Sequence, residues 1–203
     1  MHYGAKEALN SQTTKLMETV LDLENPNFVS FTGDMVSGRI FFKCVILAGD
    51  WNYTAGWHKK QWLHWTSPVT NRRIHYGYAL GNHDGEGELS RKEVIELDMT
   101  NEYSLTQLSP PDISGYSNYV LPVYKSAFSD EVVMNIWFFD SGDYSCYGIT
   151  GYGCIQNDVV QWYRTKSKEL EISQNGMKKG IAFFHIPPQD FMFAWNVHSI
   201  SLV

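Results

Sequence analysis

The chain has 203 residues, of which 43% are hydrophobic and 15% aromatic, and its formal net charge is −6. The aromatic and aliphatic content excludes a disordered chain, and the length predicts a single domain. The negative charge and the lack of a long basic run argue against nucleic-acid binding, which needs clustered Lys and Arg. No apolar stretch approaches the ~20 residues that cross a bilayer, so no membrane span is predicted.

The chain contains three cysteines, Cys44, Cys146 and Cys154. An odd count does not describe a disulfide framework. Cys146 and Cys154 are close enough in sequence to pair, but we favour unpaired, buried cysteines. The first residues contain no apolar signal region. The sequence predicts neither a compartment nor an oligomeric state.

In the first half of the chain, helical and strand patterns alternate. Residues 5–24 carry apolar side chains at near-helical spacing and are followed by Pro26, which ends the predicted helix. Residues 28–31 form a short apolar run typical of a buried strand. A second helix is predicted over 55–66 and a second strand over 74–80.

The alternation continues in the second half. Ser90, with a glutamate three residues later, predicts a helix that begins with a capping box. Two strands, predicted to pair antiparallel, a helix and a last strand follow in that order: 119–124, 132–139, 157–170 and 181–184. Strands that alternate with helices predict an α/β fold.

Polar residues that could bind a metal or carry a charge come directly after four of the predicted strands: Asp34, Asn82, Asp140 and His185. In open α/β sheets, ligands bind beyond the carboxyl ends of strands. We therefore expect these four side chains to lie at one edge of the molecule.

Taken singly, each of these motifs has an ordinary explanation. Gly33-Asp34 is a common turn sequence, and a lone histidine such as His185 is more often a structural residue than a ligand. The cluster Gly81-Asn82-His83-Asp84 is more specific. An asparagine offers a carbonyl oxygen to a metal, a histidine can act as an acid, and a neighbouring carboxylate can orient it.

Together, the motifs resemble those of the calcineurin-like metallophosphoesterase family. That family's pattern is D-x-H, G-D, G-N-H-[DE], a lone His, and G-H-x-H. In this sequence, the first motif is matched only by its histidine, His2. The G-D motif is matched by Gly33-Asp34, the G-N-H-[DE] motif by the Gly81–Asp84 cluster, and the lone histidine by His185. The run from Thr32 to Gly38 is similar to that of the small class-III purple-acid-phosphatase-like proteins.

The resemblance implies a sandwich of two β-sheets flanked by helices and a hydrolase of phosphate esters. Two metal ions (Mn, Fe or Zn) about 3.5–4 Å apart would clamp the phosphoryl group and activate water. His2 would bind the first ion, Asp34 would bridge both, and Asn82 and His185 would bind the second. His83 would protonate the leaving group and be oriented by the Asp84 carboxylate.

The resemblance is incomplete at both ends. The aspartate of the first motif would precede Met1, and no G-H-x-H lies between His185 and Val203. We therefore expect residues 1–203 to form one metallophosphoesterase domain that lacks its first strand and its G-H-x-H region. Such a chain is expected to be a weak or inactive hydrolase. The alternative is an inactive fragment or binding module that keeps the fold.

Overall fold

The structure is a computed structural model that describes residues 7–37, 55–188 and 190–191. Within these ranges the helices are α1 (Glu7–Glu24), α3 (Trp57–Thr70), α4 (Arg91–Asp98) and α5 (Asn157–Ser173). The strands are β1 (Phe28–Phe31), β2 (His75–Tyr78), β3 (Tyr119–Tyr124), β4 (Val132–Phe138), β5 (Tyr144–Cys146), β6 (Ile149–Tyr152) and β7 (Lys179–Phe183).

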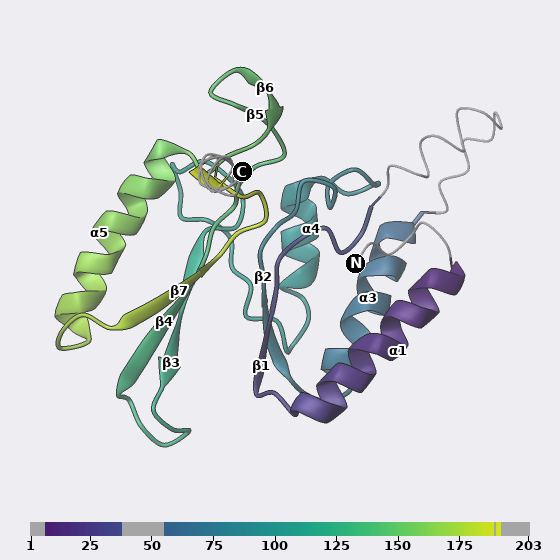
Figure 1. The fold of residues 1–203 in the computed structure, drawn as a ribbon, viewed down its shortest axis with the longest axis horizontal. Helices are drawn as coiled ribbons and strands as arrows, with labels where there is room; N and C mark the ends of the chain where they lie inside the picture. Colours follow the sequence, from purple (N-terminus) through teal and green to yellow (C-terminus); the bar gives the residue numbers. More distant parts are fainter. Residues whose placement is uncertain (1–6, 38–54, 189, 192–203) are drawn as a thin grey trace, which may run out of the picture.

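The elements form layers in the order helices, sheet, sheet, helix (Figure 1). Strands β1 and β2 pair in parallel, and a second sheet has the order β3-β4-β7. Strand β3 is antiparallel to β4, as predicted, and β4 is parallel to β7. A separate hairpin joins β5 and β6. The predicted mixed α/β fold is thus confirmed, with two layered sheets and helices outside them.

An aromatic core lies between the β1–β2 sheet and helices α1, α3 and α4. Trp65 packs edge-on against Phe31, with ring centroids 4.8 Å apart. The buried carboxylate of Asp98 accepts hydrogen bonds from the indole of Trp62 at 2.9 Å and the hydroxyl of Tyr76 at 2.7 Å. These bonds matter because a buried polar group without a partner destabilises the fold.

A second core joins the two sheets. The aromatic rings of Tyr119 and Phe138 are stacked 4.6 Å apart, and a Cβ on Gly77 would lie 2.5 Å from the ring of Phe138. The hydroxyl of Tyr119 accepts from the amide of Tyr78 at 2.9 Å and donates to its carbonyl at 3.0 Å. The ends of β2 and β4 are therefore held beside one another.

A smaller third core lies under α5. Val159 is fully buried there, and the indole of Trp137 packs edge-on against Trp162 and Tyr163. Strand β7 is more exposed, and Ile181 remains 44% exposed.

Most of the predicted elements are present, with shifted boundaries. The capping box at Ser90 is confirmed, because its hydroxyl accepts from the amide of Glu93 and the Glu93 carboxylate accepts from the Ser90 amide. Helix α3 runs on to Thr70 despite containing Pro68. The proline cannot donate to the carbonyl of His64, but the Ser67 hydroxyl does so at 2.8 Å. Among the described residues, no helix is long and apolar enough to cross a membrane.

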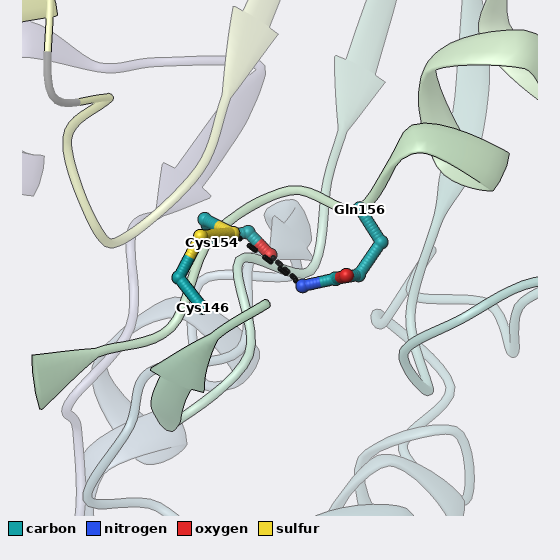
Figure 2. Close-up of a disulfide and its surroundings, with 3 residues drawn as sticks. All are labelled: Cys146, Cys154 and Gln156. Atoms are coloured by element: carbon teal, nitrogen blue, oxygen red, sulfur yellow. Dashed lines mark hydrogen bonds between the residues drawn. A yellow bond between two sulfur atoms is a disulfide. The ribbon is translucent and has the colours of Figure 1, made fainter. Parts of the chain in front are cut away.

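The hairpin of β5 and β6 was not predicted, and the expectation of unpaired cysteines is wrong. Cys146 and Cys154 form a disulfide with their Cα atoms 5.4 Å apart (Figure 2). Both lie, only partly buried, at the hairpin rather than in a core. The hairpin turns the chain back on itself and so brings the two thiols together. Cys44 lies outside the described residues.

Candidate active site

The turns after β1 and β2 approach one another so closely that only glycine fits. A Cβ on Gly33 would lie 2.7 Å from both the Cα of Gly81 and the Nδ1 of His185. A Cβ on Gly81 would lie 2.1 Å from the amide nitrogen of Asp34. Asp34 itself has a left-handed φ of 56°, which aspartate tolerates better than most residues. The tight approach brings Asp34 beside the Gly81–Asp84 turn.

Three of the predicted metal ligands converge at this edge. The Nε2 atom of His185 lies 3.1 Å from Oδ1 of Asn82 and 3.2 Å from Oδ2 of Asp34. The prediction that the groups following β1, β2 and β7 meet at one edge is therefore confirmed. The roles of these residues as ligands stay a prediction.

The protonation of His185 follows from its other ring nitrogen. Nδ1 lies 2.7 Å from the carbonyl oxygen of Thr32, which can only accept a hydrogen bond, so Nδ1 carries a proton. When the imidazole is neutral, Nε2 therefore presents a lone pair to the oxygens of Asp34 and Asn82. Three electron-pair donors then face one another, and a cation shared between them satisfies all three.

A proton can serve as that cation, and the pKa shifts reflect it. The hydrogen bond with Asp34, reinforced by Thr32, raises the pKa of His185 although burial opposes the change. Burial acts to raise the pKa of Asp34, but hydrogen bonds from His185 and from the amide of His83 outweigh it and lower the pKa. The pair thus favours the charged form of both partners.

A metal ion fits the same place. Asp and Asn oxygens and an imidazole nitrogen suit Mn, Fe or Zn, and a ligating histidine commonly donates its other N–H to a backbone carbonyl, as His185 does here. The described part of the chain holds no group of three or more His, Cys, Asp or Glu residues that could bind a metal. The third ligand atom would be the side-chain oxygen Oδ1 of Asn82. These three residues therefore fit one ion, which they enclose only in part. His2, predicted to bind the other ion, lies outside the described residues.

His83 lies beside this cluster. Its Nε2 is 3.9 Å from Oδ2 of Asp34, and its amide donates to Oδ1 of the same carboxylate at 2.9 Å. Its Nδ1 lies 2.8 Å from Oε2 of Glu86. The imidazole therefore turns one nitrogen toward the cluster and is held at the other by a carboxylate.

The expectation that Asp84 orients His83 is wrong. Asp84 is fully buried, and its carboxylate accepts from the amides of Gly81 at 2.8 Å, Asp34 at 2.9 Å and Val36 at 3.1 Å, and from the hydroxyl of Tyr78. Within the described ranges no hydrogen bond joins Asp84 to His83. The Asp84 side chain turns inward because it is the acceptor for the donors that both turns leave unpaired. Asp84 therefore holds the two turns together. The contact with His83 that was predicted for Asp84 is made by Glu86 instead.

Asp140, the remaining group at a strand end, is also buried. Its carboxylate forms an ion pair with Arg91 and accepts from the amides of Tyr116 and Gly142, both at 2.8 Å. The guanidinium of Arg91 also donates to the carbonyl of Gly81. The ion pair therefore ties the end of β4 to the turn after β2, and Asp140 does not face the cluster.

The hairpin β5–β6 closes one side of the site. A cavity of about 480 Å³ is lined by residues of the two regions: Asn82, His83, Tyr144, Ser145, Thr150, Gly151 and Tyr152. The hydroxyl of Tyr144 donates to Oε1 of Glu86 at 2.8 Å and accepts from the side-chain Nδ2 of Asn82 at 3.4 Å. Sequence reasoning missed both Glu86 and Tyr144. The one local signal was that Glu86 lies three residues after His83.

No protein-family model matches the chain. Probable inactive purple acid phosphatase 29 of Arabidopsis thaliana is 30% identical over 198 residues, which cover 89% of this chain and 46% of that protein. Phosphatase DCR2 of Saccharomyces cerevisiae is 30% identical over 193 residues, which cover 89% of this chain and 30% of that protein. Probable inactive purple acid phosphatase 14 of Arabidopsis thaliana is 26% identical over 196 residues, covering 88% and 46%.

The chain thus spans less than half the length of each of these relatives. The matches cover most of the chain, and the names of the relatives agree with the family that the motifs resemble. The chain is therefore similar to purple acid phosphatase-like proteins, and these relatives support the resemblance to the calcineurin-like metallophosphoesterases.

Proposed function

We propose that the cluster of Asp34, Asn82 and His185 binds a metal ion for the hydrolysis of phosphate esters. The observation that carries this proposal is that Nε2 of His185 faces two oxygen acceptors, at 3.1 and 3.2 Å, while its Nδ1 is fixed by the carbonyl of Thr32. A metal ion in such a site supplies a Lewis acid that activates water and stabilises negative charge on a phosphoryl oxygen.

The other residues of the site act on the substrate's protons and position. We assign to His83, in its imidazolium form, the transfer of the Nε2 proton to the leaving oxygen; this Nε2 lies 3.9 Å from Oδ2 of Asp34. General acid catalysis of this kind contributes about 10²–10⁴-fold. The cavity between His83 and the hairpin gives the leaving group a place.

We propose that the site would also hold a second metal ion, for which Asp34 and His2 would be ligands. The described residues supply three donors near one position, so the remaining donors would come from elsewhere in the protein. We propose that residues 1–203 belong to one metallophosphoesterase domain. The activity, substrate and partners of the whole protein are parts of this same proposal.

Metal binding tests the proposal directly. The purified chain, titrated with Mn²⁺ or Zn²⁺ in a calorimeter, is expected to bind metal, and Asp34→Asn is expected to weaken that binding at least about tenfold, because the site loses its one negative ligand. Asp130→Asn is the matched control, since Asp130 is exposed at the far end of β3 and β4. Equal binding by both variants would contradict the assignment.

The alternative is a module that binds metal or phosphate without turnover. Its motivation is that two relatives are named probable inactive purple acid phosphatases. Hydrolysis of an aryl phosphate with added Mn²⁺ separates the two: turnover that Asp34→Asn abolishes supports the enzyme, whereas metal binding without turnover supports the module. His83→Ala is expected to slow turnover while metal binding stays unchanged, because His83 is assigned to proton transfer.

A further inference from the structure

The hairpin β5–β6 lies against the candidate active site and carries residues that the proposed function leaves unassigned. Tyr144 is 42% exposed, yet its hydroxyl is engaged with Glu86 and Asn82. Its partner in the register of the hairpin is Tyr152, which is 66% exposed. Both tyrosines line the cavity, but among the described residues it is the hydroxyl of Tyr144 that bonds to Glu86 and Asn82.

Glu86 connects the hairpin with the histidine. One of its carboxylate oxygens lies 2.8 Å from Nδ1 of His83, and the other accepts from Tyr144 at 2.8 Å. A carboxylate gripped at both oxygens loses the freedom to rotate away from either partner. The imidazole is thereby kept with Nδ1 outward and Nε2 toward Asp34.

The base of the hairpin is fixed by covalent and backbone contacts. The disulfide between Cys146 and Cys154 joins the end of β5 to the segment after β6 (Figure 2). The amide of Gly153 donates to the carbonyl of Asp143 at 3.1 Å, and a Cβ on Gly153 would lie 2.5 Å from the carbonyl oxygen of Ser141. These contacts set the position of Tyr144, which lies between Asp143 and Cys146.

We propose that Tyr144 is a positioning residue for His83, that it acts through Glu86, and that the Cys146–Cys154 disulfide holds it in place. The purpose of this arrangement rests on the proposed function, in which His83 supplies a proton to the leaving oxygen. A carboxylate at Nδ1 fixes the tautomer and the rotation of an imidazole, so that Nε2 meets the substrate.

The ratio of the two neutral tautomers of His83 reports on its contact with Glu86, and it can be measured without metal, substrate or turnover. Long-range ¹H–¹⁵N NMR of the metal-free chain at alkaline pH, assigned with His83→Gln, is expected to show His83 with its proton on Nδ1. In Tyr144→Phe, Glu86 loses the hydrogen bond from this hydroxyl and holds the ring less firmly, so the ratio of Nδ1–H to Nε2–H is expected to fall about threefold to tenfold, the range for one lost hydrogen bond. Glu86→Gln is expected to lower it further, because the charged acceptor is gone.

Tyr147→Phe is the matched control and is expected to leave the ratio unchanged, since Tyr147 is exposed at the turn of the hairpin and does not line the cavity. The double variant Cys146→Ser/Cys154→Ser is expected to change it in the same direction as Tyr144→Phe. A ratio that stays constant or rises in Tyr144→Phe would overturn the proposal, because it would mean that Glu86 keeps its place without the tyrosine. Failure of the proposed function is seen separately, as absent metal binding or turnover, and leaves the tautomer measurement intact.

Discussion

Asp84 and Asp34 lie at the same edge of the molecule, and the amide of Asp34 donates to the carboxylate of Asp84, yet the two carboxylates have different partners. The carboxylate of Asp84 is completely buried and accepts from three backbone amides and the hydroxyl of Tyr78. Among the described residues, the Asp34 carboxylate accepts from the amide of His83 and turns its other oxygen to His185. The first carboxylate is saturated with donors from its own fold, whereas the second faces an imidazole that a cation can bridge.

The same contrast separates Asp140 from Asn82. Asp140 is neutralised by Arg91 and two amides, while the Oδ1 of Asn82 meets the Nε2 of His185. The inner groups hold three strand ends together, whereas the outer groups face one another around the position that a cation fits. The role of a carboxylate at a strand end therefore depends on the hydrogen-bond donors around it, and its position after a strand does not by itself predict that role.

Removal of the inner carboxylate Asp84 should have the largest effect on stability. Asp84→Ala is expected to lower the free energy of unfolding by about 3–5 kcal/mol, because it leaves several buried donors without an acceptor. Urea denaturation followed by tryptophan fluorescence measures the change. The comparison variant Asp34→Ala is expected to cost about 1 kcal/mol or less, since a partly exposed ion pair contributes little. Equal losses in the two variants would break the distinction between inner and outer groups.

The ion pair of Arg91 and Asp140 should have the next largest effect. Arg91→Ala is expected to cost about 3 kcal/mol, because it leaves the Asp140 carboxylate buried without its counter-charge. A double-mutant cycle with Asp140→Ala is expected to give a coupling energy of about 1–3 kcal/mol, the range for residues in one buried network. Additive losses would show that the pair does not act as a unit.

The pH dependence of stability tests the outer pair and should be the smallest effect. The pKa of His185 is raised, so its contribution is complete below its unfolded pKa and is lost as pH rises through the folded value. The pKa of Asp34 is lowered, so its contribution is complete above its unfolded pKa and is lost as pH falls through the folded value.

In the metal-free chain, the Asp34–His185 pair is therefore expected to stabilise the fold most between about pH 4 and 6.5, which are the ordinary pKa values of the two groups. The expected contribution is about 1 kcal/mol or less. Thermal unfolding across pH 3 to 9 measures this contribution as the difference between the chain and His185→Gln. A difference that grows above neutral pH would contradict the assigned direction.

Local rules in the sequence were enough for most elements and for the place of the site. Apolar periodicity predicted α1, and the Ser90 and Glu93 pair predicted the start of α4, because both depend on neighbours within a few residues. The order of polar residues after apolar strands predicted that Asp34, Asn82 and His185 would meet, because strands that run in parallel end at the same edge.

Only the tertiary structure decided what each group does there. Glu86 and Tyr144 are 58 positions apart in the sequence, and Asp34 and Asp84 are 50 apart, so no local pattern reports their hydrogen bonds. The disulfide depends likewise on a hairpin whose exposed strands carry little apolar periodicity. A carboxylate's role follows from the donors and charges that surround it, and in this protein those come from distant parts of the chain.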